Sequence, residues 1–189
     1  MNLLALVLVG FPGSGKTTAS VYFRSVKIPV IRMGDLTDIT LSKLNLPKTA
    51  VNETKIRRLL RKEFDEEVYS KFALKKINKF YGTESIVAVE GLKSEKELKF
   101  LEKKLRRLKI IFISAKRKIR FERLAKREIR PLNFRQAINR DNEEKRLFKV
   151  KHLKEISDFI VKNESSIFYF HNRLKKILKI IQHDSPQNI

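Results

Sequence analysis

Short, almost wholly apolar runs recur along the chain, separated by longer stretches with apolar residues three or four positions apart. Uninterrupted apolar runs are typical of strands buried on both faces, as in a parallel sheet. The stretches between them predict amphipathic helices that cover such a sheet. We therefore expect an α/β fold with a parallel sheet covered on both faces. The predicted strands occupy residues 3–9, 30–33, 86–89, 110–113 and 159–161.

The helical pattern is strongest over residues 52–81, which is long for one globular helix, so we expect a break near Asp65. Ser94 and Glu97 have the spacing of a capping box at a helix start. Residues 183–189 are expected to form a flexible tail. The predicted helices occupy residues 17–25, 36–46, 52–81, 94–105, 116–129 and 133–148, with a last one around residues 170–181.

Residues 10–18 read GFPGSGKTT and match the phosphate-binding pattern G-x-x-x-x-G-K-[ST] in its required strand-to-helix context. Glycines let successive N–H groups turn toward a polyphosphate, and the start of the next helix adds its positive end. Lys16 would reach the β- and γ-phosphates, and the Thr17 hydroxyl would ligate Mg²⁺. The alternative is a glycine-rich turn with a chance lysine. The residues expected to bind the nucleotide are Gly10, Pro12, Gly13, Ser14, Gly15, Lys16, Thr17 and Thr18.

Two predicted strands end in a carboxylate, at the sheet edge where parallel α/β proteins bind their ligands. Glu90 follows the third strand and could hold the hydration shell of Mg²⁺ through water; a surface glutamate is the alternative. Asp35 follows the second strand. It could accept a hydrogen bond from a substrate hydroxyl, organise a metal-bound water or cap the next helix.

Arginines recur on the helical region after the fourth strand. Arg120, Arg123, Arg127 and Arg130 would share one face of a continuous helix, opposite apolar residues. A solvated helix face explains this pattern equally well. Its place opposite the phosphate loop favours a role in phosphoryl transfer, where guanidinium groups stabilise developing charge. Arg140 could add a further clamp from the next helix.

Net charge adds an electrostatic expectation. The 189 residues carry 43 Lys and Arg against 21 Asp and Glu, which gives a formal charge of +22. This charge favours polyanionic partners, either phosphorylated small molecules or RNA, but a heat-adapted protein with a lysine-rich solvated surface would show it too. The sequence has no cysteine and no apolar stretch long enough to span a membrane, so we expect a cytoplasmic protein without a membrane partner.

The spacing of these motifs resembles that of archaeal adenylate-kinase-related P-loop nucleotide kinases, which are similar to nucleoside monophosphate kinases and dephospho-CoA kinases. The resemblance implies a P-loop NTPase fold, a three-layer α/β/α sandwich with a five-stranded parallel sheet, in one domain over residues 1–182. It also implies ATP and Mg²⁺ as cofactors, an adenine edge near Asn163, an acceptor-binding helical segment at about 36–81 and a helical lid at about 116–149. It rests on the phosphate loop and on residues 28–35, 90–94, 119–124, 140–141 and 157–163.

The acceptor site departs from the pattern of that family. Asp38 stands where the family carries an arginine for the acceptor phosphate. Lys93 replaces a second arginine, which keeps the charge but loses the bidentate fork. Arginines at positions 57, 58 and 61 could supply the missing guanidinium. The residues expected to bind the acceptor are Asp35, Arg58, Arg61, Lys93 and Arg140.

The leading hypothesis is an ATP- and Mg²⁺-dependent phosphotransferase of the nucleoside monophosphate kinase type, which transfers the γ-phosphoryl group to a nucleotide-like acceptor. Two alternatives stay open: an RNA- or ribosome-associated P-loop ATPase, and a nucleotide-binding paralogue without kinase activity. The residues expected to act in catalysis are Lys16, Glu90, Arg120, Arg123 and Arg127.

Overall fold

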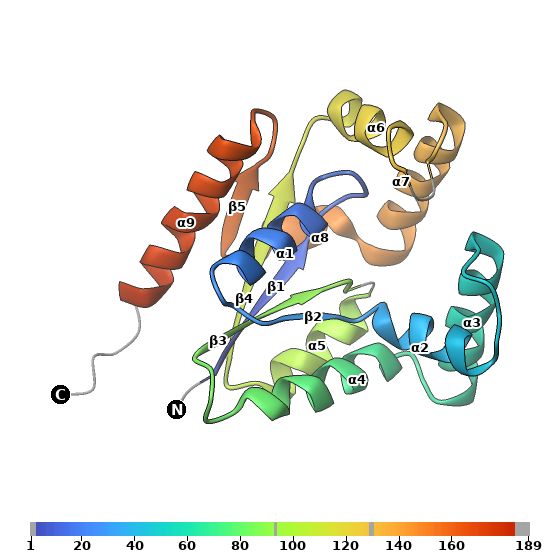
Figure 1. Cartoon of the computed structure of the whole chain (residues 1–189), viewed down its shortest axis with the longest axis horizontal. Helices are drawn as coiled ribbons and strands as arrows, with labels where there is room; N and C mark the ends of the chain where they lie inside the picture. The colour runs from blue at the N-terminus through green and yellow to red at the C-terminus, as the bar shows by residue number, and fades with distance from the viewer. Residues whose placement is uncertain (1–2, 93, 129–130, 184–189) are drawn as a thin grey trace.

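A computed structural model describes residues 3–92, 94–128 and 131–183. Its centre is one sheet in the order β2-β3-β1-β4-β5, and every neighbouring pair of strands is parallel (Figure 1). The predicted five-stranded parallel sheet is therefore confirmed. The strands are β1 (Leu4–Val9), β2 (Val30–Arg32), β3 (Ile86–Glu90), β4 (Arg107–Ser114) and β5 (Phe159–Lys162).

Alternate residues of β1 face two separate apolar layers, because successive side chains of a strand point to opposite faces. Leu4, Leu6 and Leu8 pack in the layer formed by α1 (Lys16–Ser25) and α9 (Ile167–His183). Ala5, Val7 and Val9 pack in the other layer, to which the remaining helices around the sheet contribute. These helices are α2 (Asp35–Lys43), α3 (Ala50–Glu63), α4 (Val68–Ile77), α5 (Glu95–Lys104) and α8 (Val150–Glu155).

Several element boundaries differ from the sequence-based expectation. The predicted break in residues 52–81 is confirmed, because α3 ends at Glu63 and α4 begins at Val68, with a 3₁₀ turn η1 (Asn78–Phe80) after it. Strand β4 begins at Arg107, earlier than its apolar run, since its polar first residues pair with β1. Helix α8 was not predicted; it adds Val150 and Leu153 to the core.

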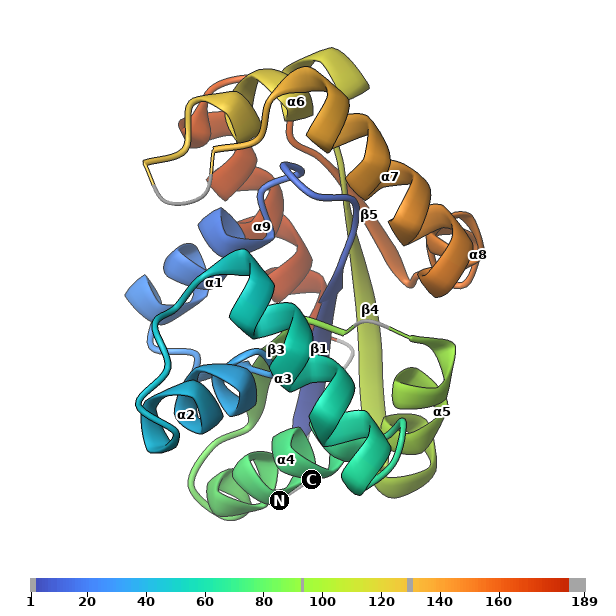
Figure 2. The ribbon, with the colours of Figure 1, turned by 90° about the vertical axis from the view of Figure 1, so that its right-hand side faces the viewer.

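Two helix pairs lie on either side of the loop between β1 and α1 (Figure 2). Above it in that view, α6 (Arg117–Ala125) packs on α7 (Phe134–Phe148) around a small core of Phe121, Leu124 and Ala137. Below it, α2 packs on α3. No helix of the described chain is long and apolar enough to cross a membrane. Of the predicted tail, residues 184–189 lie outside the described residues.

Candidate functional site

The phosphate loop, residues 10–18, connects β1 to α1 and has a backbone that only glycine fits at Gly10, Gly13 and Gly15. Gly13 has φ +78° and Gly15 has φ +108°, in the region that favours glycine. A Cβ on Gly13 would lie 2.5 Å from the carbonyl oxygen of Arg120, and one on Gly15 would lie 2.1 Å from Nδ2 of Asn163. The loop is therefore held closely against α6 and against the chain that follows β5.

Three features of this loop fit a bound polyphosphate. Gly15 is the N-cap of α1 and supplies no side-chain cap, so the first N–H groups of the helix keep their capacity to bind an anion. The ammonium of Lys16 donates to the carbonyl oxygens of Gly10 at 2.6 Å and Phe11 at 3.1 Å, which keeps the charge on the loop. The buried Ser14 hydroxyl makes no hydrogen bond to any described residue.

The two predicted Mg²⁺ residues lie together. Thr17 Oγ1 donates to Glu90 Oε1 at 2.9 Å, and Ser20 Oγ donates to Glu90 Oε2 at 2.7 Å. Glu90 is only 8% exposed, so its carboxylate is fixed at the end of β3 beside the loop. A hydroxyl next to a carboxylate is the oxygen set that Mg²⁺ prefers, with water filling the other positions. Within the described residues, no group of three His, Cys, Asp or Glu side chains could hold a metal by itself.

Asn163 supports the loop from beneath. Its buried amide donates from Nδ2 to the Ser14 carbonyl oxygen at 2.8 Å, while its Oδ1 accepts from Arg123 Nη2 at 3.4 Å. The side chain is thus committed to the phosphate loop. These contacts make Asn163 a positioning residue for the phosphate loop, and the adenine edge expected near it stays a prediction.

The arginines of the lid divide into different roles. Arg120 is 5% exposed and forms a bidentate ion pair with Asp141 of α7, at 2.7 and 2.6 Å. It also donates to the Pro12 carbonyl oxygen at 3.0 Å. All of these contacts join α6, α7 and the loop. The contacts of Arg120 therefore give it a structural role at the base of the lid, and its expected catalytic role stays a prediction.

Arg123 is the lid arginine best placed to contact a phosphate. Its Nη1 is buried without a hydrogen-bond partner among the described residues, and its bond from Nη2 to Asn163 is long. Arg127 lies beyond the end of α6 at Ala125 and is exposed, so the predicted single arginine face does not extend to it. Arg130 lies outside the described residues.

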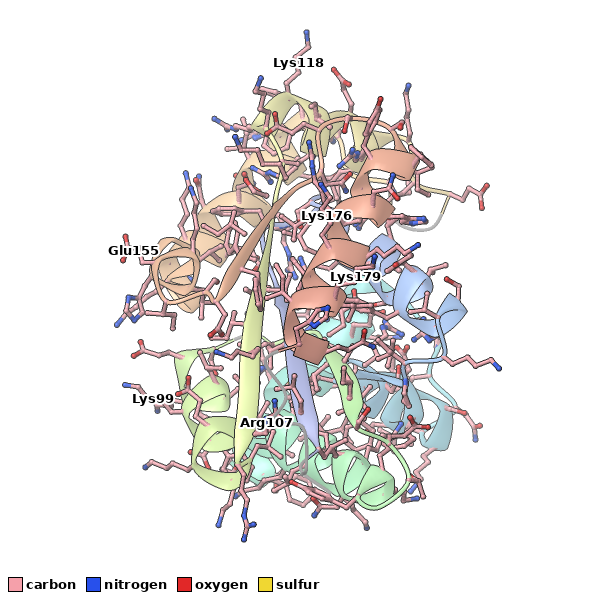
Figure 3. All side chains as sticks on the ribbon, turned by 90° about the vertical axis from the view of Figure 1, so that its left-hand side faces the viewer. Lys99, Arg107, Lys118, Glu155, Lys176 and Lys179 are labelled. Carbon is pink, nitrogen blue, oxygen red and sulfur yellow. The ribbon has the colours of Figure 1, made fainter. Side chains whose placement is uncertain are left out.

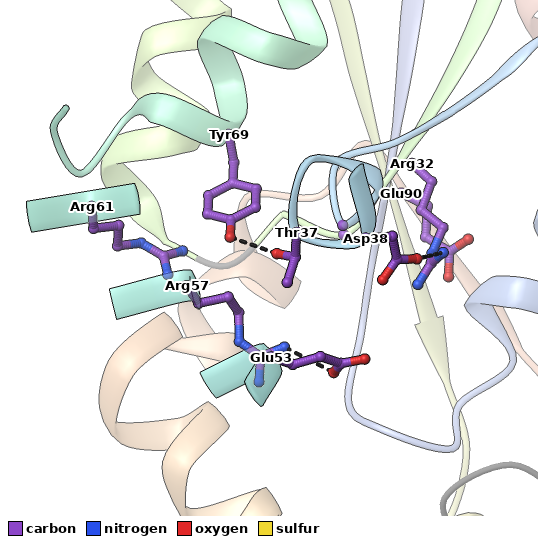
Figure 4. A pocket seen from close by; sticks show the side chains of 10 residues that line it. Arg32, Thr37, Asp38, Glu53, Arg57, Arg61, Tyr69 and Glu90 are labelled. Carbon is purple, nitrogen blue, oxygen red and sulfur yellow. Dashed lines mark hydrogen bonds and ion pairs between the residues drawn. The ribbon is translucent and has the colours of Figure 1, made fainter. Parts of the chain in front are cut away.

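A cavity of about 160 Å³ opens beside Glu90, between the ends of β2 and β3 and helices α2, α3 and α4. In Figure 4, Arg32, Asp38 and Glu90 gather on one side of it and Arg57, Arg61 and Tyr69 on the other. We name these two groups the carboxylate end and the guanidinium end. The lining residues are Arg32, Gly34, Thr37, Asp38, Glu53, Arg57, Arg61, Tyr69, Glu90 and Gly91.

At the carboxylate end, Asp38 is already paired with two cations. Arg32 Nη1 lies 2.9 Å and Lys48 Nζ 2.6 Å from the same oxygen, Asp38 Oδ2. Burial raises the pKa of Asp38, but the hydrogen bonds and charges of Lys48 and Arg32 outweigh it and leave the pKa below its ordinary value. Asp38 is therefore ionised at neutral pH.

At the guanidinium end, the ion pairs are longer: Arg57 lies 3.4 Å from Glu53, and Arg61 lies 3.1 Å from Glu97 and 3.8 Å from Glu66. Burial lowers the pKa of Arg57, and the nearby charge of Arg140 lowers it further. The bonds of Arg57 are long, 3.4 Å to Glu53 and 3.2 Å to Thr54. Arg61 donates to Glu97 at 3.1 Å and lies 4.9 Å from the ring centre of Tyr69. This end can accommodate an anion that relieves the desolvated positive charge.

The predicted acceptor residues do not all lie at the cavity. Asp35 does not line the cavity; it begins α2 and pairs with Arg32 at 3.3 Å and Lys76 at 3.7 Å. Arg61 lines the cavity, whereas Arg58 is exposed on the other side of α3, and that prediction is corrected to Arg57. Arg140 pairs with Glu143 and Glu144 on α7. Lys93 lies outside the described residues.

The lining residues missed by the sequence analysis are Arg32, Thr37, Glu53 and Tyr69. The helical phase of α3 carried a usable signal for Glu53 and for the choice of Arg57. These residues flank the buried positions Ile56 and Leu60, whereas Arg58 is about 200° around the helix from Ile56. For Tyr69 and Thr37, whose hydroxyls lie 2.6 Å apart, no local pattern indicates the contact.

Solved structures share this fold at low sequence identity. TT1252 from Thermus thermophilus superposes with a TM-score of 0.69 at 16% identity, over 95% of this chain and 98% of that one. Shikimate kinase from Acinetobacter baumannii, in complex with shikimate, gives a TM-score of 0.60 at 14% identity, over 98% and 96% of the two chains. The fold is therefore that of P-loop kinases.

Sequence comparison gives closer relatives. No family model matches the chain. A UPF0200 protein from Methanocaldococcus jannaschii is 33% identical over 181 residues, which cover 95% of this chain and 91% of the relative. A UPF0200 protein from Pyrococcus horikoshii is 27% identical over 187 residues, 97% of this chain and all of the relative. At this identity and coverage, the chain belongs to the UPF0200 family.

Proposed function

We propose that the protein is an ATP- and Mg²⁺-dependent phosphotransferase, with the donor on the phosphate loop and the acceptor in the cavity beside Glu90. The observation that carries the proposal is the contact of 2.9 Å between Thr17 and Glu90. It joins the loop that would hold the triphosphate to the wall of the cavity that would hold the acceptor. Donor and acceptor would therefore meet at one point.

In phosphoryl transfer, the protein would position the two substrates and stabilise the charge of the transition state. Lys16 would move from its loop carbonyls to the β- and γ-phosphates, and Thr17 with Glu90 would hold the hydrated Mg²⁺. When bound, Mg²⁺ would neutralise charge on the phosphate oxygens. Arg123 would donate its unused Nη1 hydrogens to the transferred group. Lys16 and Thr17 begin α1, Glu90 ends β3 and Arg123 lies on α6, so the fold itself aligns groups from three elements.

The acceptor class expected from the sequence is a nucleotide, as in nucleoside monophosphate kinases and dephospho-CoA kinases. The structural neighbours include shikimate kinases, which share the fold alone. A first panel therefore contains nucleoside monophosphates, dephospho-CoA and shikimate. Formation of ADP that depends on one of these compounds would support the proposal.

The matched variant for this test is Glu90→Gln, with Glu102→Gln as the control. Glutamine keeps the shape beside Thr17 but loses the charge, so we expect at least a tenfold lower rate and a higher Mg²⁺ requirement. Glu102 is exposed on α5 and its variant should behave as the wild type. Binding of ATP without transfer to any acceptor would instead indicate a nucleotide-binding paralogue without kinase activity.

A second candidate function, nucleotide-dependent RNA binding, is favoured by one surface. Helix α9 contains no acidic residue and carries Arg173, Lys175, Lys176 and Lys179. Residues 103–127 contain twelve Lys and Arg against one acidic residue. Figure 3 shows Lys176 and Lys179 on α9, with Lys118 above them and Arg107 of β4 below them in that view. We define the α9 face as the surface formed by Arg173, Lys175, Lys176 and Lys179; its charge suits the phosphates of RNA.

The test is RNA binding as a function of salt. A variant with Lys175, Lys176 and Lys179 changed to Gln should bind more weakly, and the slope of log K against log salt should fall by about one for each phosphate that these lysines neutralise. The control changes three exposed lysines of α2 and α3, Lys43, Lys55 and Lys62, to Gln. Equal effects of the two triple variants on RNA binding would show that the α9 face contributes only general surface charge. An effect of ATP on the α9 contribution would support a nucleotide-gated RNA function.

A further inference from the structure

We infer that the phosphoryl acceptor is a small hydroxy acid, whose alcohol is the nucleophile and whose anionic group lies between Arg57 and Arg61. This inference rests on the proposed phosphotransferase function and names the acceptor class. It differs from the nucleoside monophosphate acceptor expected from the sequence, in which a phosphate oxygen would be the nucleophile. The arrangement of charge along the cavity carries it.

The cavity wall nearest the phosphate loop does not suit a phosphate nucleophile. Arg32, the cation that lines it, is already paired with Asp38, which also pairs with Lys48 outside the lining. Glu90 adds a further carboxylate there. An incoming phosphate would have to displace the Arg32–Asp38 pair and approach the carboxylates of Asp38 and Glu90, whereas a neutral hydroxyl meets no such repulsion.

The carboxylate end also offers a specific partner for a hydroxyl. Arg32 and Lys48 both contact Oδ2 of Asp38, and its second oxygen, Oδ1, accepts no hydrogen bond from any described residue. Asp38 lines the cavity. Its Oδ1 can therefore accept the O–H of an alcohol and turn the oxygen lone pair of that alcohol toward the donor.

The guanidinium end, in contrast, favours an anionic group. Arg57 and Arg61 are one helical turn apart on α3, with the Tyr69 ring beneath Arg61 and Arg140 close enough to act on the charge of Arg57. The hydrogen bonds of Arg57 to Glu53 and Thr54 are 3.4 and 3.2 Å long, so a carboxylate or phosphate could replace them with shorter charge-assisted bonds. The anionic group of the acceptor is therefore placed at the guanidinium end.

The size of the cavity limits the acceptor further. At about 160 Å³, it is smaller than the sites that hold drug-sized ligands, which start at about 300 Å³. In the reaction, the alcohol oxygen forms a bond to the γ-phosphorus of ATP while the bond from that phosphorus to the β-γ bridging oxygen breaks. ADP leaves, the alcohol proton passes by way of Asp38 to solvent, and the product is a phosphate monoester.

The bond formed distinguishes this acceptor from a nucleoside monophosphate even while the compound itself is unidentified. The protein is incubated with ATP labelled in the γ-phosphate and either a pool of small hydroxy acids, such as glycerate, threonate and quinate, or a pool of nucleoside monophosphates. The products are then treated with hot acid, which releases phosphate from anhydrides and leaves monoesters intact. We expect acid-stable label from the hydroxy acid pool only. Glycerol, which lacks the carboxylate of glycerate, should accept at least tenfold less label.

Arg57→Ala and Arg58→Ala form the matched pair of variants, because they remove the same charge from adjacent positions of α3. Arg57→Ala should raise the KM for the hydroxy acid about 10- to 100-fold with little change in KM for ATP, and Arg57→Lys should recover part of the loss. Arg58→Ala should match the wild type. Asp38→Asn should lower kcat more than it raises KM.

The outcomes separate this inference from the proposed function. Acid-labile label on nucleoside monophosphates, or equal effects of the two arginine variants, would overturn the hydroxy acid and leave the phosphotransferase standing. The same holds if ATP binds but no hydroxy acid is labelled. If ATP does not bind at all, the proposed function itself fails, and the inference with it.

Discussion

In the donor half of the site, side chains bond to the backbone of the phosphate loop: Lys16 to Gly10 and Phe11, Asn163 to Ser14, and Arg120 to Pro12. In the acceptor half, side chains bond mainly to one another, as in the pairs Arg32–Asp38, Thr37–Tyr69, Arg57–Glu53 and Arg61–Glu97. The donor half thus depends on backbone shape, which a contiguous motif determines. The acceptor half depends on side-chain identity, which can change without changing the fold.

This difference explains how one fold can serve several acceptors. The glycines at 13 and 15 cannot be replaced without steric conflict with Arg120 or Asn163, so the donor half tolerates little variation. The cavity beside Glu90 is lined by side chains from β2, β3, α2, α3 and α4, which come from distant parts of the sequence. Specificity is therefore expected to reside in the acceptor half.

The largest expected effect concerns the ion pair that fastens the lid to the donor half. Asp141→Ala leaves the Arg120 guanidinium buried without its carboxylate, which should lower the free energy of unfolding by about 3–5 kcal/mol. The double variant Arg120→Met/Asp141→Leu should recover most of that loss. Chemical denaturation measures both. A single variant as stable as the wild type would show that Arg120 is not held by this pair.

The next largest effect is expected on catalysis, at Arg123 of the donor half. Arg123→Ala removes the lid guanidinium with an unused buried donor, and we expect kcat to fall about 10- to 100-fold while the melting temperature changes little. Lys126→Ala, which removes an exposed charge just after α6, is the matched control. If both variants lose activity equally, the effect is general electrostatics and Arg123 has no special position.

A smaller effect tests how firmly the acceptor half is organised. Thr37 and Tyr69 share a buried hydrogen bond of 2.6 Å, and burial raises the pKa of Tyr69, so its hydroxyl stays protonated through the neutral range. Thr37→Val and Tyr69→Phe should each cost about 1 kcal/mol of stability. In a double-mutant cycle the two costs should not add. Additive costs would show that the two hydroxyls are not coupled.

The smallest expected effect is that of pH. Because the folded pKa of Asp38 lies below its ordinary value of 3.8, its carboxylate stays ionised until the pH falls below that value, and only then is its contribution lost. Phosphoryl transfer should accordingly be nearly flat from about pH 5 to about pH 9. An acidic limb centred well above pH 5 would assign the essential carboxylate to a group other than Asp38.

The sequence predicts the donor half better than the acceptor half for a physical reason. The phosphate loop and Glu90 follow apolar strands directly, so strand ends place them at one sheet edge. The structural role of Arg120 is not apparent from the sequence because its partner Asp141 is 21 residues away on another helix. Burial of that pair depends on how α6 packs on α7, which periodicity does not specify.

In the acceptor half, the sequence indicates a cationic helix, and the phase of its apolar positions favours Arg57 over Arg58, but it does not indicate the partners of these arginines. Arg61 lines the cavity as expected, whereas Arg57 is separated from Arg58 only by the phase of α3 against its neighbours. Arg32 belongs to a predicted strand, yet its side chain reaches Asp38 across the start of α2. Contacts of this kind depend on tertiary packing, and a single sequence does not show them.

The most direct test of the donor site is a calorimetric titration of ATP with Mg²⁺ into the wild-type protein and into the Lys16→Ala and Lys43→Ala variants. Lys16 lies in the phosphate loop and Lys43 at the exposed end of α2. We predict one ATP per chain for the wild type and Lys43→Ala, and binding weakened at least tenfold in Lys16→Ala. Equal affinity in all three proteins would contradict this site, because the triphosphate would then lie elsewhere.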